Sequence, residues 1–214
     1  GFYYRLFWPG PKPEWSGIVP GCSHYHHYSR PTLTHTQDRQ RTQLEIAGIT
    51  DVRPSDLAFM DSDIGRFNLP ESFALLIPGS SLKMAVKRWP AVSYGEIAQR
   101  LHQAGIMSVL LGGKEDEEAI QTIKEICPEA RDLSGQTTLY DIPALARAAS
   151  LAIGNDTGPM HMAALSGCRT IAIFSTKSFP DKAAPRGPNV TLLVEENLMD
   201  LEQHRIWEAV EARL

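Results

Sequence analysis

The sequence has little cysteine, and its three cysteines, Cys22, Cys127 and Cys168, lie far apart. An odd, scattered set of this kind is not a disulfide framework, and no CxxC pair indicates structural zinc. His24 and its neighbours His26 and His27 have no suitably spaced acid or cysteine, so we interpret them as part of a polar loop and not as metal ligands. We therefore expect a reduced, cytoplasmic setting and no metal.

Long apolar runs and an excess of basic charge are missing too. No run approaches the roughly 18 apolar residues that a membrane-spanning helix needs. The net charge is −4 and the isoelectric point about 6.0, which gives no support to nucleic-acid binding, since such proteins usually carry a basic face. With 43% hydrophobic and 21% charged residues among 214, the composition is that of an ordinary globular chain.

Regular patterning is scarce in residues 1–70. Residues 8–13, for example, are rich in Pro and Gly without sustained apolar periodicity, which is typical of loops. We expect one helix over 36–47, ended by Gly48. The chain opens with Gly1 in place of Met, so we expect either a fragment or upstream residues that this sequence omits.

From Phe73 onward, apolar strands alternate with amphipathic helices. The run from Phe73 to Ile77 is continuously apolar, as strands buried on both faces are, and Ser93 with Glu96 matches a capping box at a helix start. The alternation predicts an α/β fold with a Rossmann-like parallel sheet, helices on both faces, and ligands beyond the carboxyl ends of the strands. We expect strands at 73–77, 107–111, 151–154, 170–174 and 190–194, and helices at 93–104, 115–126, from 138, 159–166 and 201–213.

The most informative segment joins the strand at 151–154 to the helix at 159–166. Asp156, Thr157 and His161 crowd the turn, so a carboxylate, a hydroxyl and an imidazole meet unpaired N–H groups at a helix start. This combination suits a ligand that carries both phosphate and sugar hydroxyls. The competing interpretation is a helix capped by Asp156 with His161 merely packed, and we favour the functional one.

A second segment, residues 78–81 (Pro-Gly-Ser-Ser), follows the strand at 73–77, and Lys87 comes soon after. A Gly-Ser loop exposes N–H groups and hydroxyls to an anion, and a lysine neutralises phosphate charge. The loop is not a Walker A motif, because GxxxxGK[ST] is absent. A plain connecting loop with a solvated lysine is an equally good interpretation of this segment alone.

Two acidic segments are weaker candidates. After the strand at 107–111, Gly112 and Gly113 allow close approach of a ligand, and Glu115 could hydrogen-bond a ribose diol. Acids are favoured in the first turn of any helix, however, so a solvated face is the simpler interpretation. Asp61 and Asp63 match a DxD metal motif superficially, but they precede the first regular strand, which argues against a metal site.

Taken together, these segments resemble glycosyltransferase family 9, the ADP-heptose:lipopolysaccharide heptosyltransferases. The resemblance covers roughly residues 73–175 and implies the GT-B arrangement, in which two Rossmann-like domains face a cleft and the second holds the nucleotide-sugar. Residues 71–214 would be this donor-binding domain. Residues 1–70 would be a linker and a remnant of the acceptor-side domain, most of which is missing. The matching segments are 78–81, 87–90, 110–115, 133–135 and 154–161.

The resemblance implies roles for residues on the diphosphate and nucleoside side. Ser80 and Ser81 would lie at the diphosphate, and Lys87 would stabilise the charge of the leaving group. Glu115 would meet the ribose, and Thr138 would lie near the adenine.

It also implies roles for the turn before the 159–166 helix. Asp156 would hold sugar hydroxyls, and the N–H groups of Thr157 and Gly158, with His161, would line the phosphate side. Lys87, Asp156 and His161 are then the expected catalytic residues, with the general base outside this chain.

The implied reaction is metal-independent, inverting transfer of a sugar, with ADP-heptose as the expected donor, a lipid-linked or saccharide acceptor of the lipopolysaccharide-core type, and no cofactor. Departing ADP builds negative charge, which oriented N–H groups, a helix N-terminus and a lysine can stabilise. The family's base lies in a glycine-rich loop of its first domain, and residues 1–70 contain no such loop. Peripheral association at the inner face of the cytoplasmic membrane would then depend on the missing domain.

Two alternatives stay open. The chain could be a nucleotide-binding module without transfer activity, because the acceptor domain and the base are absent from it. It could also belong to a nucleotide-sugar epimerase of the same architecture, although residues 87–90 (Lys-Arg-Trp-Pro) argue against that.

Overall fold

The computed structural model describes residues 7–11, 13–27, 34–53, 55–81 and 84–214. The chain divides into two compact units, Gly1–Pro54 with Asp181–Ala183, and Ser55–Pro180 with Ala184–Leu214.

The described residues of the first unit contain little regular structure. Two short strands, β1 (Ser16–Gly17) and β2 (His24–Tyr25), pair in parallel. Helix α2 (Thr36–Ile46) confirms the helix expected over 36–47, and Gly48 follows it with a φ of 82°, a value that favours glycine. None of the α2 residues is buried, so α2 contributes little to a core.

The second unit is built on a six-stranded sheet in which every neighbouring pair of strands is parallel, which confirms the predicted fold class. The strand order is β5-β4-β3-β6-β7-β8, so numbering these strands 1 to 6 along the chain gives the doubly wound order 3-2-1-4-5-6. The order reverses between β3 and β6. The strands are β3 (Phe73–Ile77), β4 (Met107–Leu110), β5 (Arg131–Asp132), β6 (Leu151–Asn155), β7 (Thr170–Ser175) and β8 (Val190–Glu195).

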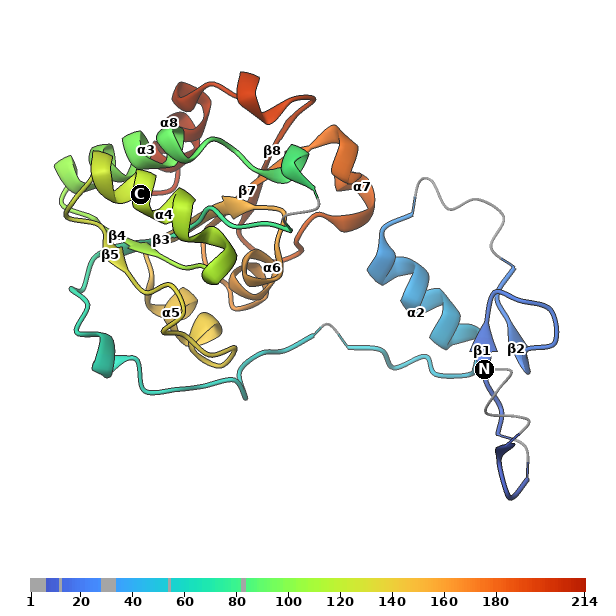
Figure 1. Ribbon diagram of the computed structural model, residues 1–214. Helices are drawn as coiled ribbons and strands as arrows, with labels where there is room; N and C mark the ends of the chain where they lie inside the picture. The colour runs from blue at the N-terminus through green and yellow to red at the C-terminus, as the bar shows by residue number, and fades with distance from the viewer. Residues whose placement is uncertain (1–6, 12, 28–33, 54, 82–83) are drawn as a thin grey trace. The chain divides into compact units, whose positions relative to one another are not determined.

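Helices cover both faces of this sheet: α3, α4 and α8 lie over one face and α5 and α6 over the other (Figure 1). The α-helices are α3 (Ala91–Gln103), α4 (Glu117–Ile126), α5 (Asp141–Ala148), α6 (Gly158–Leu165), α7 (Pro180–Ala183) and α8 (Gln203–Glu211). The short 3-10 helices are η1 (Gly65–Phe67), η2 (Ala85–Lys87), η3 (Lys114–Asp116), η4 (Thr176–Ser178) and η5 (Leu198–Asp200).

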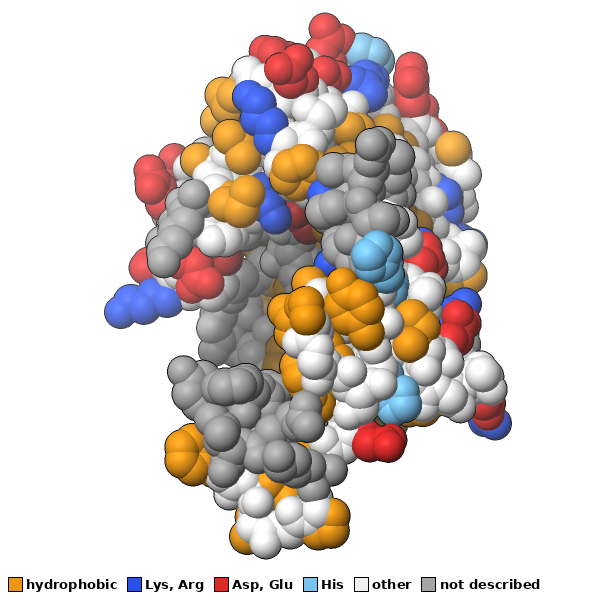
Figure 2. Space-filling model, turned by 90° about the vertical axis from the view of Figure 1, so that its right-hand side faces the viewer, with side chains coloured by type: hydrophobic (Ala, Val, Ile, Leu, Met, Phe, Trp, Pro, Cys, Tyr) orange, Lys and Arg blue, Asp and Glu red, His pale blue; other side chains and the backbone are white. Residues whose placement is uncertain are grey.

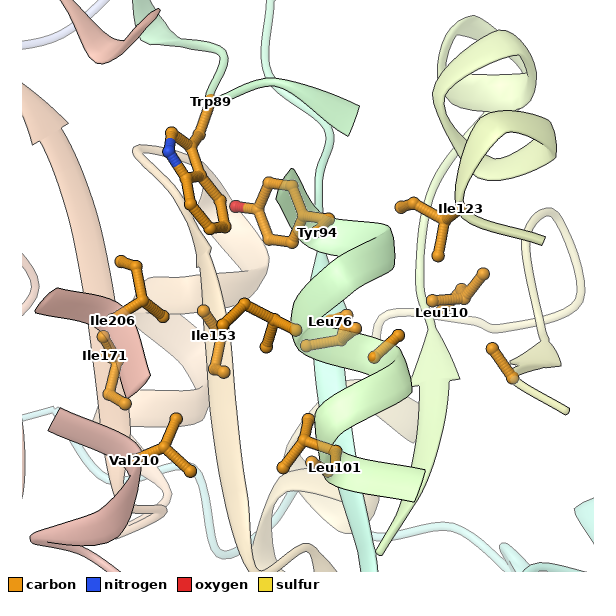
Figure 3. Packing of buried hydrophobic residues seen from close by; sticks show 14 of the residues in the cluster. Leu76, Trp89, Tyr94, Leu101, Leu110, Ile123, Ile153, Ile171, Ile206 and Val210 are labelled. Atoms are coloured by element: carbon orange, nitrogen blue, oxygen red, sulfur yellow. The ribbon is translucent and has the colours of Figure 1, made fainter. Parts of the chain in front are cut away.

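The main core lies between the sheet and the helices α3, α4 and α8 (Figure 3). Leu76 and Ile153 from neighbouring strands point toward Leu101 of α3, and all three are fully buried. Burying each such side chain contributes about 1.5–3 kcal/mol. At the carboxyl end of the sheet, Trp89 packs edge-on against Tyr94 with ring centroids 4.9 Å apart, which closes the core beneath the loops.

Several element boundaries differ from the sequence expectation. Helix α3 starts at Ala91 with Pro90 at its N-cap, so the predicted capping box at Ser93 was wrong; both of its residues lie inside the helix. Helix α5 starts at Asp141, not at Thr138. Strand β5 was not expected, because its two residues are too short to show periodicity.

Residues 55–66 pack on α5, although the sequence suggested a linker up to residue 70. Arg147 donates to the carbonyls of Leu57 and Met60, and the Ser62 hydroxyl donates to an Asp141 carboxylate oxygen at 2.6 Å. These contacts explain why the second unit begins at Ser55.

The surface mixes both signs of charge. On the face drawn in Figure 2, Lys and Arg side chains are interspersed with Asp and Glu side chains. Among the described residues, no helix combines the length and the apolar character that crossing a membrane requires.

Candidate functional site

Three loops meet where the strand order reverses. They follow β3, β4 and β6, whose carboxyl ends lie at the same edge of the sheet because the strands are parallel. Together with Thr137 and Ile142 they enclose a cavity of about 300 Å³. The lining residues are Ile77, Gly79, Ser80, Ser81, Leu111, Gly112, Gly113, Glu115, Asp116, Thr137, Ile142, Thr157 and Pro159.

Several residues singled out from the sequence share this cavity, Gly112 and Gly113 among them. Ser80 and Ser81 come from the loop after β3, Glu115 from η3 after β4, and Thr157 from the N-cap of α6. The helix thus begins at the cavity wall, where its first N–H groups and positive dipole end favour an anion. Three segments far apart in the sequence therefore form one hollow, which polar and apolar residues line together.

Lys87, Asp156 and His161 form a second group beside the cavity. The Lys87 Nζ lies 2.5 Å from Asp156 Oδ2, and His161 Nε2 lies 4.0 Å from Asp156 Oδ1. The Ser80 hydroxyl donates to the Asp156 carbonyl at 3.3 Å, which joins this group to the cavity loop. The Lys87 and Asp156 side chains are 19% and 8% exposed, so water screens their ion pair only in part.

The sequence interpretation gave Lys87 to the diphosphate and Asp156 to sugar hydroxyls, and it did not foresee their direct contact. In this pair Lys87 offsets the charge of Asp156, so the carboxylate adds little net negative charge beside the cavity. Gly158 is the first residue of α6 and does not line the cavity.

Asn155 is a residue that sequence reasoning missed. It is fully buried at the end of β6, and its side-chain oxygen accepts hydrogen bonds from the Trp89 backbone N–H and the Tyr94 hydroxyl, both at 3.1 Å. Its amide nitrogen donates to the Pro78 carbonyl at 2.7 Å. Asn155 therefore fixes the loop after β3 against the start of α3. A polar residue that ends an apolar strand was the available signal.

Thr138 lies three residues before α5 and not in the cavity lining, where its neighbour Thr137 lies. Its N–H and hydroxyl both donate to the buried Asp141 carboxylate, at 2.6 and 2.8 Å, and Arg66 pairs with the same carboxylate at 2.6 Å. Burial would raise the pKa of Asp141, but the hydrogen bonds from Arg66, Ser62 and Thr138 outweigh it and hold this pKa well below its ordinary value.

Both acids considered as metal ligands, and His24 among the histidines, have partners of opposite charge or hydrogen-bond donors nearby. Asp61 pairs with Arg147 at 3.2 Å, and Asp63 accepts a hydrogen bond from the Gly65 N–H at 2.8 Å. His24 lies 3.2 Å from a Glu14 carboxylate oxygen. Within the described part of the chain, no group of three or more His, Cys, Asp or Glu residues is arranged to hold a metal ion.

A second cavity of about 340 Å³ adjoins the first and shares Gly113 with it. It lies over the carboxyl ends of β4 and β5, and its other lining residues are Lys114, Glu117, Ile120, Gln121, Asp132, Ser134 and Gly135. The two hollows extend from the switch point, where the strand order reverses between β3 and β6, toward the β5 edge of the sheet.

Known proteins resemble this chain over most of its length. The model of glycosyltransferase family 9 (heptosyltransferase) matches residues 25–209. Lipopolysaccharide heptosyltransferase 2 of Escherichia coli K12 is 34% identical over 113 residues, which are 50% of this chain and 32% of that protein. The chain thus spans about a third of the length of this relative.

Solved structures share the fold. Escherichia coli ADP-heptose lps heptosyltransferase II has a TM-score of 0.63 and 26% identity, over 76% of this chain and 52% of that one. The glycosyl transferase family 9 protein from Veillonella parvula has a TM-score of 0.77 and 21% identity, over 91% and 64%. With a family match that spans residues 25–209, the chain belongs to glycosyltransferase family 9, the heptosyltransferase family.

Proposed function

We propose that this chain supplies the donor site of a heptosyltransferase and binds a nucleoside diphosphate sugar, with ADP-heptose as the expected donor. The observation that carries the proposal is the cavity at the switch point, where the Ser80–Ser81 loop faces the start of α6. The solved Escherichia coli relative is described as an ADP-heptose enzyme, which supports the same donor here.

The two cavities suggest how the donor lies. The diphosphate would rest between residues 78–81 and the N-terminus of α6, since both present N–H groups and hydroxyls to an anion. The ribose would reach Glu115, and the nucleoside would extend toward the cavity over β4 and β5. The sugar would lie near Asp156, whose carboxylate can accept hydrogen bonds from hydroxyls.

The reaction we propose is a direct displacement with inversion. An acceptor hydroxyl oxygen attacks the anomeric carbon, and the bond from that carbon to the diphosphate oxygen breaks, so that the electron pair leaves with ADP. Lys87, 2.5 Å from Asp156, could turn to the diphosphate as its charge grows, and the N-terminus of α6 would stabilise that charge without a metal. The hydroxyl proton goes to a carboxylate base that the family resemblance assigns to the first domain.

The acceptor we propose is a saccharide of the lipopolysaccharide-core type. The Escherichia coli relative is named a lipopolysaccharide heptosyltransferase, which supports this class. A cytoplasmic enzyme with peripheral membrane association would suit such an acceptor.

A nucleotide-binding module without transfer activity is the second candidate. The first unit favours it, because its described residues form two strands of two residues each and a helix with no buried side chain. Activity assays with an acceptor saccharide separate the two candidates when an acceptor-side domain that carries the base is supplied, because only the first candidate then predicts release of ADP.

The donor site is tested by thermal unfolding with ADP, UDP, ADP-heptose and inorganic phosphate. At about 100 times its dissociation constant, a true ligand should stabilise the chain by about 2.7 kcal/mol. Asp156→Ala should weaken ADP-heptose binding more than ADP binding. EDTA and Mg²⁺ should leave both affinities unchanged. No shift with any nucleoside diphosphate would refute the donor site, and equal losses for both ligands would make Asp156 a structural cap.

A further inference from the structure

Arg88 connects two walls of the cavity, and neither the family resemblance nor the proposed mechanism gives it a role of its own. Its guanidinium donates to the Ser80 carbonyl in the loop after β3 and to Asp116 Oδ1 at 2.8 Å, in the turn after β4. The Arg88 side chain is 21% exposed and that of Asp116 is 7% exposed, so this ion pair is largely sheltered from water.

Asp116 carries the connection further into the second loop. Its Oδ2 accepts a hydrogen bond from the Gly113 N–H at 3.0 Å, which holds the turn that presents Glu115. A Cβ at Gly79 would clash with the Asp116 carboxylate, so the two loops lie in close contact. Ser80, Gly113 and Asp116 all line the cavity. A chain of hydrogen bonds thus spans the cavity wall.

The backbone conformation explains why the consecutive residues Lys87 and Arg88 contact two different loops. Lys87 ends the 3-10 helix η2, and Arg88 follows it in an extended conformation, with φ −102° and ψ 115°. The two side chains therefore diverge. Lys87 reaches Asp156 after β6, and Arg88 reaches Asp116 after β4.

Arg88 also neutralises a negative charge in the cavity wall, that of Asp116. Asp116 is a sheltered carboxylate in the wall of a cavity that we assign to a diphosphate, and two like charges at short range repel strongly where water is scarce. Arg88 neutralises that carboxylate and also donates to the Ser80 carbonyl, whose partial negative charge it offsets. Lys87 cannot replace it, because Lys87 contacts Asp156.

We propose that Arg88, acting through Asp116 and the Ser80 carbonyl, is a positioning residue that sets the spacing of the two diphosphate-facing loops and cancels the charge of Asp116. The inference rests on the proposed donor site. Arg88 itself is not required to touch the donor.

The test is a calorimetric titration of ADP into the full chain and its variants, well below their melting temperatures. Arg88→Met should raise the Kd for ADP by about tenfold or more, because Asp116 becomes a sheltered, unpaired carboxylate facing the anion. Asp116→Asn should raise it less, about threefold, because it loosens the Gly113 turn but removes the repulsion. Combining Asp116→Asn with Arg88→Met should bind ADP more tightly than Arg88→Met alone.

Arg100→Met is the matched control. It removes one arginine of α3 that stacks on Trp207, away from the cavity loops, and should leave the Kd within twofold of the original chain. Arg88→Lys is the second variant in case Arg88→Met does not fold. It keeps the charge, but the lysine ammonium ends one bond short of the Arg88 Nη2 that bonds both Ser80 and Asp116, so an increase in Kd of about threefold to tenfold is expected.

The outcomes separate this inference from the proposed function. If the original chain binds no nucleoside diphosphate, both fail. If it binds ADP and Arg88→Met binds ADP equally well, with only the melting temperature lowered, Arg88 is merely structural and this inference alone is wrong. Strictly additive losses in the double variant would also overturn the charge-cancelling role.

Discussion

Replacing Asp141 by Asn should destabilise the second unit in a pH-dependent way. The carboxylate is fully buried at the start of α5, and it accepts hydrogen bonds from Ser62, from the N–H and hydroxyl of Thr138, and from Arg66. Asn keeps the shape and one oxygen acceptor but removes the charge that strengthens all these bonds. The substitution therefore isolates the electrostatic part of this cluster.

The expected loss at pH 7 is about 2–3 kcal/mol. Arg66 is 44% exposed, so solvent screens its ion pair with Asp141, and we assign that pair no more than about 1 kcal/mol. The bonds from Ser62 and Thr138 go to a charged acceptor, which is worth roughly 1.5–3 kcal/mol per bond against about 1 kcal/mol for a neutral one. Weakening them should cost about 1–2 kcal/mol more.

The pH dependence follows from the lowered pKa of Asp141 in the folded chain. A carboxyl whose folded pKa lies below its unfolded value, about 3.9, stabilises the fold above that unfolded value and loses this contribution as the pH falls. The difference between the original chain and Asp141→Asn should stay constant from pH 7 to about pH 5. It should then shrink, by roughly 1 kcal/mol at pH 3.

Urea unfolding followed by circular dichroism at pH 7, 5, 4 and 3 measures this difference. Asp61→Asn is the control, because the Asp61 side chain is 80% exposed, and its pair with Arg147 should contribute at most about 0.5 kcal/mol. Equal midpoints for Asp141→Asn and the original chain at pH 7, or a loss that grows toward pH 3, would refute this account of the cluster.

Three further predictions concern the core and the cavity. Asn155→Ala should lower the free energy of unfolding by about 3–5 kcal/mol, because it leaves the Tyr94 hydroxyl, the Trp89 backbone N–H and the Pro78 carbonyl without a hydrogen-bond partner. A loss below about 1 kcal/mol in urea unfolding would contradict this network. Gly187→Ala should cost about 3 kcal/mol, because the new Cβ would overlap the backbone carbonyl of Ala164 in α6, and an unchanged melting temperature would show that the backbone gives way there. Glu115→Gln should weaken ADP binding about tenfold and leave stability within about 0.5 kcal/mol, because Glu115 is exposed on the cavity rim; equal calorimetric affinities would remove its ribose role.

Much of the second unit could be predicted from the sequence, because strands buried on both faces leave continuous apolar runs. The strands expected at 73–77, 107–111, 151–154, 170–174 and 190–194 are present as β3, β4, β6, β7 and β8, with ends that agree to within one residue. The first residues of the helices were harder to predict from the sequence. The capping-box pattern at Ser93 competed with Pro90, whose fixed φ starts α3 earlier.

The candidate site was predictable as a set of loops and not as a set of contacts. Parallel strands bring their carboxyl ends to one edge, so the loops of Ser80, Glu115 and Thr157 could be placed together from the pattern alone. Lys87 and Asp156 are 69 positions apart in the sequence, and their pairing depends on the direction in which the Lys87 side chain leaves η2. No local pattern encodes that direction, and the same holds for Arg88 with Asp116.

A crystal structure of the chain soaked with ADP tests the central claim most directly. The account predicts the diphosphate between residues 78–81 and the first turn of α6, the ribose at Glu115, and Lys87 within hydrogen-bonding distance of a phosphate oxygen. ADP bound at the opposite edge of the sheet, or a diphosphate that contacts neither Ser80, Ser81 nor the start of α6, would contradict it.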